Sequence, residues 1–351
     1  MTPKDTAQRG VMVGGMQLQD ARTKRAFFSL DLVDLDALDP KDAIQRVPMT
    51  FLAHGFAVDP RRRGVAVVLE KKGPGAAVVD LVGRRALATV EPSPGHHFYG
   101  HGQFAKDGSV LYCVETELST RRGVLSVRDR DTFRVLGDVP TFGQNPHDCV
   151  LLDGGVMLVT NGGGPVGTEE HGSVCLVELA TGKLLERSVV TKGEWNAGHL
   201  AVSDAGTFAV SSAPRDGLPE KESPGGVSFR RGGGPLRPMD EPRDVTGRML
   251  GESLSVAVHE ASGVAVVTNP WGNLMTLWDV REGQLLEARA MEFPRGVTLS
   301  LDGSAFVVTH GKGAIMTLFS ADRAVTSLGD AGGGTISGSH VYAWDGEGAR
   351  R

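Results

Sequence analysis

Five histidines occupy one position in a short phrase that returns along the chain, and their imidazoles are the side chains best suited to chemistry. Four open consecutive copies of the phrase and the fifth opens the last copy: His54, His101, His147, His199 and His340. Two other copies carry Glu252-Ser253 and Arg295 at this position. Imidazole nitrogen binds Fe, Cu, Zn and Ni, so histidines gathered at one point predict a transition-metal site, with iron, copper or zinc as candidates.

The phrase contains a polar residue, a short apolar strand, and then Asp-Gly or a near equivalent. It returns about every 45 residues, in seven copies that begin at Ala53, Gly100, Pro146, Gly198, Gly251, Pro294 and Ser339. A period of about 40 to 50 residues with several short strands in each unit is typical of a β-propeller. Equivalent positions of all blades then lie around one axis, so the five histidines are expected to line one mouth of the central channel.

Each copy continues with a second strand, a third strand and a more polar fourth strand, for example residues 64–70, 75–81 and 85–91. Asp-Gly between two apolar runs predicts a hairpin, and four antiparallel strands make one blade. The last copy has only one strand, and residues 10–17, 24–34 and 43–49 supply three more. We therefore predict an all-β, seven-bladed propeller, one domain over residues 1–351, whose last blade is closed by N- and C-terminal strands.

Polar residues near the ends of the second strands are expected beside the histidines, because the first and second strands form a hairpin. The predicted ligand-binding set is therefore the five histidines with Arg295, Glu115, Asn161 and Asn269. Two alternatives stay open at this point. Each histidine could instead bond a backbone group of the adjacent blade, or widely spaced rings could bind an anion with the help of Arg295.

Composition excludes some partners and leaves others open. The net charge is −5 without a long basic run, so no nucleic-acid partner is expected, and without an apolar run of about 18 residues no membrane insertion is expected. A metal ion, a small molecule or a protein docked on a propeller face remain candidate partners. Cys113, Cys149 and Cys175 lie in apolar stretches without metal-site spacing, which predicts buried core residues. The polar insertion at 213–247 is expected to be a solvated loop or a lid over one face.

Several phrases are similar to those of one bacterial family. FYGHGQFAKDGSVLYCVETE from Phe98, GQNPHDCVLLDGGVMLVTNGG from Gly143 and GHLAVS from Gly198 resemble the domain of unknown function 1513 family, and the resemblance runs from about Arg25 to Trp344. It implies a seven-bladed propeller related to YVTN-repeat and quinoprotein amine dehydrogenase-like propellers. It also implies export to the periplasm and a connection to bacterial iron handling, but no established activity. The N-terminal MTPKDTAQRG has no apolar leader segment, which leaves the cytoplasm as the alternative location.

Three functions follow, and the first is favoured. The first is a ligand-binding propeller that holds a metal ion or metal complex. The second is a lactonase-like propeller hydrolase that uses the same mouth. The third is a scaffold for protein interactions. No G-x-S-x-G, Walker or H-E-x-x-H motif is present to indicate an enzyme.

Overall fold

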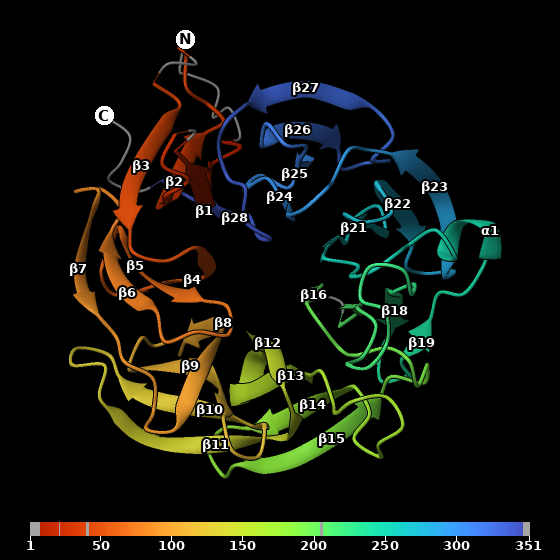
Figure 1. The fold of residues 1–351 in the computed structure, drawn as a ribbon, viewed down its shortest axis with the longest axis horizontal. Helices are drawn as coiled ribbons and strands as arrows, with labels where there is room; N and C mark the ends of the chain where they lie inside the picture. Colours follow the sequence, from red (N-terminus) through yellow and green to blue (C-terminus); the bar gives the residue numbers. More distant parts are fainter. Residues whose placement is uncertain (1–7, 21, 40–41, 204–205, 347–351) are drawn as a thin grey trace.

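Seven four-stranded antiparallel sheets surround a central axis in the computed structural model (Figure 1). The structure describes residues 8–20, 22–39, 42–203 and 206–346. Blades 1 to 6 follow one another along the chain. Their strands are β4 (Ala53–Val58), β5 (Val65–Glu70), β6 (Ala76–Asp80) and β7 (Arg85–Thr89); β8 (His96–Phe104), β9 (Val110–Glu117), β10 (Arg122–Asp129) and β11 (Val135–Gln144); β12 (Pro146–Leu151), β13 (Val156–Asn161), β14 (Ser173–Glu178) and β15 (Lys183–Val189); β16 (Leu200–Val202), β17 (Phe208–Ser212), β18 (Gly226–Arg230) and β19 (Arg237–Pro238); β20 (Ser255–His259), β21 (Val264–Asn269), β22 (Leu274–Asp279) and β23 (Gln284–Ala290); and β24 (Val297–Leu299), β25 (Ala305–His310), β26 (Ile315–Ser320) and β27 (Ser327–Gly332).

Blade 7 joins the two ends of the chain. Its strands run in the order β28 (Tyr342–Trp344), β1 (Val11–Gln19), β2 (Ala26–Asp34) and β3 (Ile44–Met49). Val11 pairs with Trp344 and Val13 with Tyr342, so the C-terminal strand becomes the innermost strand of a sheet that the N-terminal region completes. The predicted seven-bladed propeller and its closure are therefore confirmed.

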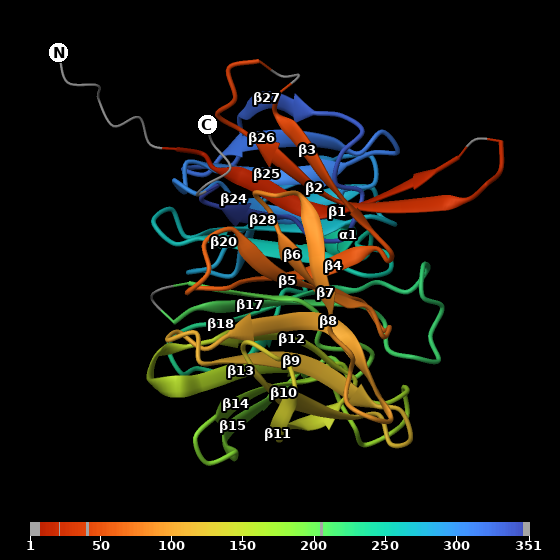
Figure 2. The ribbon, with the colours of Figure 1, turned by 90° about the vertical axis from the view of Figure 1, so that its left-hand side faces the viewer.

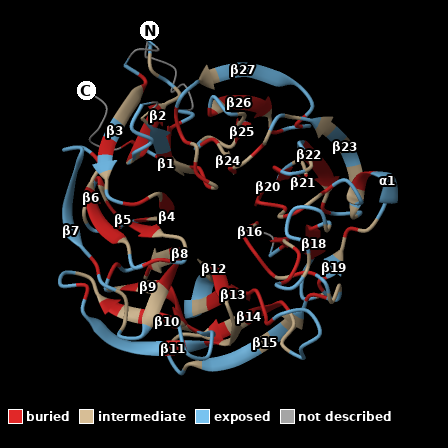
Figure 3. Ribbon diagram, in the orientation of Figure 1, coloured by how far each residue is buried: buried red, intermediate tan, exposed pale blue. Residues whose placement is uncertain are grey.

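The apolar core lies between successive blades. One cluster joins blades 1 and 2 through side chains such as Val67, Leu69, Leu111 and Cys113, and related clusters fill the other interfaces. Each buried Val or Leu contributes about 1.5–3 kcal/mol relative to an exposed one, so these contacts hold the ring together. The fourth strands form the exposed rim in Figure 3, and every residue of β7 is exposed. All three cysteines are buried, as predicted.

The two faces of the ring differ in the turns they carry. We call the side with the turns after the second strands, such as residues 71–75 and 270–273, the upper face. The opposite side, with turns such as residues 59–64, is the lower face. The β1–β2 hairpin projects beyond the ring on the upper face, at the upper right of Figure 2. Asp204 and Ala205, which belong to the fourth repeat copy, lie outside the described residues.

Helix is scarce in this fold. The described residues include the single-turn helix α1 (Arg243–Thr246) and the 3-10 turn η1 (Asp153–Gly155). Within the ranges that the structure describes, no helix has the length and apolar character needed to cross a membrane.

Candidate metal centre

Three of the five histidines lie at irregularities in the ladder between the first and second strands. The register shifts between Ala53 and Gly55 around His54, and again in the segments that contain His101 and His147. A β-bulge leaves a residue unpaired and changes the direction of its side chain. These irregularities free the three imidazoles from strict alternation across the sheet. His199 and His340 lie just ahead of β16 and β28.

Glycine allows blades 1 and 2 to meet beside these rings. Gly100 has φ +116°, and a Cβ there would lie 2.5 Å from Cδ2 of His54. A Cβ on Gly55 would lie 1.9 Å from the carbonyl oxygen of Gly100. Both contacts are shorter than van der Waals separation, so the glycines in the His-Gly phrases are what let the His54 ring fit.

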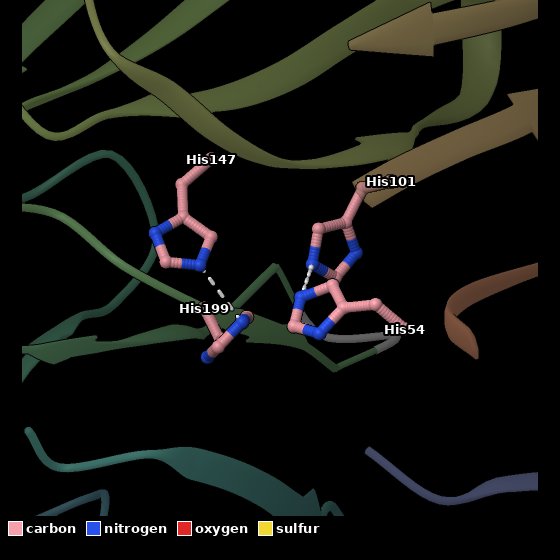
Figure 4. Close-up of side chains that lie close together, drawn as sticks. All are labelled: His54, His101, His147 and His199. Atoms are coloured by element: carbon pink, nitrogen blue, oxygen red, sulfur yellow. Dashed lines mark hydrogen bonds between the residues drawn. The ribbon is translucent and has the colours of Figure 1, made fainter. Parts of the chain in front are cut away.

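The histidines converge. Nε2 of His54 lies 3.1 Å from Nε2 of His101, and Nε2 of His147 lies 2.9 Å from Nε2 of His199, as the dashed lines in Figure 4 show. One ligand nitrogen from each of these four residues lies within 4.8 Å of the others. The alternative of rings spaced too widely to share an ion is therefore wrong.

His340 packs against the same group. Its ring centroid lies 4.0 Å from that of His199, 4.4 Å from that of His54 and 4.9 Å from that of His101. Its buried Nε2 has no hydrogen-bond partner among the described residues. The structure thus brings all five predicted histidines together, with four of them in the tightest nitrogen cluster.

The outer nitrogens of three histidines have hydrogen-bond partners that fix the rings. Nδ1 of His101 lies 3.1 Å from the Asp148 carboxylate, and Nδ1 of His199 contacts the carbonyl oxygen of Leu254. Nδ1 of His54 lies 2.8 Å from Oγ of Ser339. A carbonyl oxygen and a carboxylate only accept hydrogen bonds, so Nδ1 of His199 and Nδ1 of His101 carry the hydrogen. In the neutral forms of these two rings, Nε2 then presents a lone pair to the cluster.

Burial favours the neutral form of four of the imidazoles. The five side chains are between 2% and 8% exposed, so they lie inside the channel rather than at its predicted mouth. Burial, with smaller contributions from neighbouring positive groups, places the pKa of His54, His147, His199 and His340 well below its usual value. Neutral imidazole is the form that binds metal, so this environment prepares the rings as ligands.

The histidines separate two cavities. A cavity of about 660 Å³ opens toward the lower face and is lined in part by His101, His199 and His340. A smaller cavity of about 310 Å³ lies on the upper side and is lined in part by His54 and Ser339. We call this smaller space the upper cavity.

The other predicted site residues have different places. Arg295 lines the upper cavity. Asn269 donates to the carbonyl oxygen of Glu252, another residue of that cavity wall, and so supports the site indirectly. Glu115 pairs with Arg128 inside blade 2, and Asn161 bonds to Thr141.

Glu115 and Asn161 therefore form their contacts elsewhere, which corrects the expectation that they lie beside the histidines in the ligand-binding set. Successive side chains of a strand point to opposite faces of the sheet. These two side chains are used in contacts between strands of their own region, where Arg128 neutralises the buried carboxylate and Thr141 satisfies the buried amide.

Two supporting residues were missed by the sequence analysis. Asp148 directly follows His147, yet its carboxylate contacts His101 of the preceding blade and accepts from the backbone of Leu200 in the following one. Ser339 directly precedes His340 and contacts His54. Their positions beside histidines of the repeat were the available signal, but the contacts cross between blades.

These features define a seven-bladed β-propeller with a buried cluster of imidazoles in its channel. The chain belongs to the family described as "Protein of unknown function (DUF1513)", whose model matches residues 47–344. Among solved structures, a chain of hydrazine synthase from Kuenenia stuttgartiensis is similar, with a TM-score of 0.66 and 15% identity over 92% of this chain and 99% of that chain. This likeness shows the fold alone. Comparison with curated proteins gave no match.

Proposed function

We propose that this propeller binds one transition metal ion through His54, His101, His147 and His199. The observation that carries the proposal is the arrangement of the ring nitrogens. Hydrogen-bond partners hold Nδ1 of three of these rings, while the Nε2 atoms of the four converge in two close pairs. Metal-binding histidines commonly have their second nitrogen held by a carboxylate or a carbonyl in this way.

The spacing suits such an ion. With metal–nitrogen bonds of about 2.0–2.1 Å, neighbouring ligand nitrogens lie roughly 2.9–3.3 Å apart in square-planar or tetrahedral sites. The two observed Nε2 pairs, at 3.1 and 2.9 Å, fall in or near this range, and the 4.8 Å limit on the group requires only small ring movements to close. His340 packs on three of the four rings and is the available fifth imidazole.

Iron, copper and zinc all accept imidazole ligands, so the donor set alone does not choose among them. Competition between Fe(II), Cu(II) and Zn(II) for the purified protein is the measurement that does. Strong retention of Fe(II) against Zn(II) would support the role in bacterial iron handling that the family resemblance implies. The hydrolase and scaffold alternatives stay predictions.

Calorimetric titration of metal-free protein tests the proposal. We expect saturation near one ion per chain, and loss of that binding in the double variant His101→Ala/His147→Ala. The matched control is His259→Ala/His310→Ala, because these imidazoles bond to Ser262 and Thr317 instead of to the cluster. Absence of saturable binding in the wild-type protein would overturn the proposal, whether or not the buried double variant folds.

A further inference from the structure

The upper cavity contains a cation, Arg295, that forms no close ion pair with any residue the structure describes. Arg295 lines this cavity and is half-buried, and its Nε donates to the carbonyl oxygen of Gly338 at 3.2 Å. Among the described residues, no carboxylate forms an ion pair with Arg295 within 4.0 Å. Hydrogen-bond donors of a half-buried guanidinium therefore remain available to a ligand.

The other charged groups in the same wall are already engaged. Nζ of Lys71 lies 3.5 Å from Oε1 of Glu252, so these two charges offset each other. The carboxylate of Glu70 accepts from the backbone N–H of Gly75 at the turn that follows its own strand. Glu252 also acts electrostatically on Arg295, but among the described residues it forms its ion pair within 4.0 Å with Lys71, so the N–H groups of Arg295 suit a ligand with a single negative charge.

Another part of the wall is apolar and aromatic. Trp271 and Phe293 meet edge to face, with ring centroids 5.6 Å apart, and the Arg295 guanidinium lies 5.3 Å from the centre of the Phe293 ring. Leu52, Leu254 and Pro270 complete this surface. The cavity therefore combines apolar surface with a few polar and charged groups, as small-molecule pockets usually do, and Arg295 is the charged anchor among them.

The backbone is strained at Phe293 in this wall and at the nearby Asn273. Phe293 has φ +42°, a conformation that costs a bulky side chain free energy, and Asn273 has φ +46°. Oδ1 of Asn273 accepts from the backbone N–H of Phe293 at 2.9 Å and so fixes the turn. Strained residues that persist next to a pocket are commonly part of a ligand clamp.

The 213–247 insertion reaches the edge of the same cavity. Nζ of Lys221 lies 4.2 Å from the centre of the Trp271 ring. The insertion is anchored through buried Arg215, which donates to the carbonyl oxygens of Gly164 and Gly193. This segment therefore braces one aromatic wall residue, which is a more specific role than that of a solvated loop.

We propose that the upper cavity binds a small organic monocarboxylate, with its carboxylate on Arg295 and its apolar body against Trp271 and Phe293. A volume of about 310 Å³ is at the small end of ligand pockets and limits the ligand to a compact molecule. This inference goes beyond the metal site. Its main contact is with Arg295, so binding does not require a metal ion.

Ligand-observed NMR titration tests this proposal on the full-length protein, both metal-free and loaded with Zn(II). The probes are acetate, butyrate, benzoate and phenylacetate, each compared with its uncharged primary amide. We expect saturable binding of at least one carboxylate with an apolar body, weaker binding of acetate, and weaker binding of the matching amide. Arg295→Gln should weaken carboxylate binding by about 10- to 100-fold, because a charge-assisted hydrogen bond is lost. Arg295→Lys should restore part of it.

Arg289→Gln is the matched control, because this arginine lies on outer strand β23 and pairs with Glu287. It should leave probe binding unchanged. Failure of all four carboxylates to bind in both forms of the protein would overturn the inference, as would equal binding to wild type and a folded Arg295→Gln variant. Either result leaves the calorimetric test of the metal site unaffected, so the two proposals fail separately.

Discussion

His147 and His199 face each other through Nε2 atoms 2.9 Å apart, inside the channel. The Leu254 carbonyl fixes the hydrogen of His199 on Nδ1, so Nε2 of neutral His199 can only accept. His147 must then donate from Nε2, which leaves its buried Nδ1 without a hydrogen-bond partner among the described residues. A bound metal ion would instead take the lone pairs of both Nε2 atoms. Without a metal ion, the hydrogen bond between these two residues leaves one buried nitrogen unpartnered. With a metal ion, both Nε2 atoms could serve as ligands.

Stability of the metal-free protein should fall as the pH decreases from about 7.5 to about 5.5. The pKa values of four buried histidines are lowered in the folded state by burial, whereas the unfolded chain protonates them near 6.5. Below that pH the unfolded state binds more protons, so the free energy of unfolding falls, by up to about 1.4 kcal/mol per pH unit for each histidine.

The charged groups near these rings are Lys71, Arg295, Glu252 and Asp148. Burial is nevertheless the largest cause of the lowered histidine pKa values, so it sets the direction of the pH effect. Urea denaturation at several pH values measures the effect. Above about pH 7 these histidines should no longer contribute a slope. A free energy of unfolding that stays constant from about pH 7.5 to about pH 5.5 would contradict this prediction.

Asp148→Asn should weaken metal binding by about 10- to 100-fold, because the carboxylate orients His101 through Nδ1 and raises the basicity of its Nε2. The amide is similar in size, so the change acts on charge and hydrogen bonding. Asp153→Asn is the matched control, since Asp153 lies in an exposed turn and pairs with Lys106. Competitive titration against a chelator gives both affinities. Equal metal affinities of the two variants would show that Asp148 does not support the metal site.

Gly100→Ala should destabilise the protein and disturb metal binding, because its Cβ would collide with the His54 ring at a backbone φ of +116°. Gly95→Ala separates the two effects, since Gly95 has φ +76° and open space where a Cβ would lie. We expect a loss of about 1 kcal/mol for Gly95→Ala and about 3 kcal/mol or more for Gly100→Ala. Similar denaturation midpoints for the two variants would show that the contact with His54 has little effect.

Glu115→Gln should lower stability by about 3–5 kcal/mol and leave metal affinity unchanged. Its carboxylate is fully buried and pairs with Arg128, so the substitution leaves a buried guanidinium without its counterion. Chemical denaturation and a metal titration of the folded variant measure the two effects. A large loss of metal affinity with unaltered stability would contradict this prediction and show that Glu115 contributes to the metal site.

The ring and its histidines could be predicted from the sequence because both depend on the repeat. Equivalent positions in different blades face the same axis, so the position shared by His54, His101 and His147 was sufficient to place them together. The depth of the cluster was not predictable in this way. It depends on ladder irregularities such as the shift around His54, and on how closely Gly55 and Gly100 let two blades approach.

Contacts between blades also escaped the sequence analysis. Asp148 lies next to His147 in the chain, but its carboxylate contacts His101. This contact becomes apparent only when the two blades are placed side by side. Glu115 and Asn161 were placed at the site because their strands end near it. The direction of each side chain depends on its register in the sheet and on partners such as Arg128 and Thr141, which the repeat pattern does not encode.

X-ray absorption at the metal edge, on protein loaded with one equivalent of Zn(II), tests the central claim most directly. We predict a first shell of four or five nitrogen ligands at about 2.0–2.1 Å, with the outer-shell scattering of imidazole rings. The His101→Ala/His147→Ala variant should lose that pattern. A first shell dominated by water or carboxylate oxygen, with one imidazole or none, would contradict a metal centre built from the channel histidines.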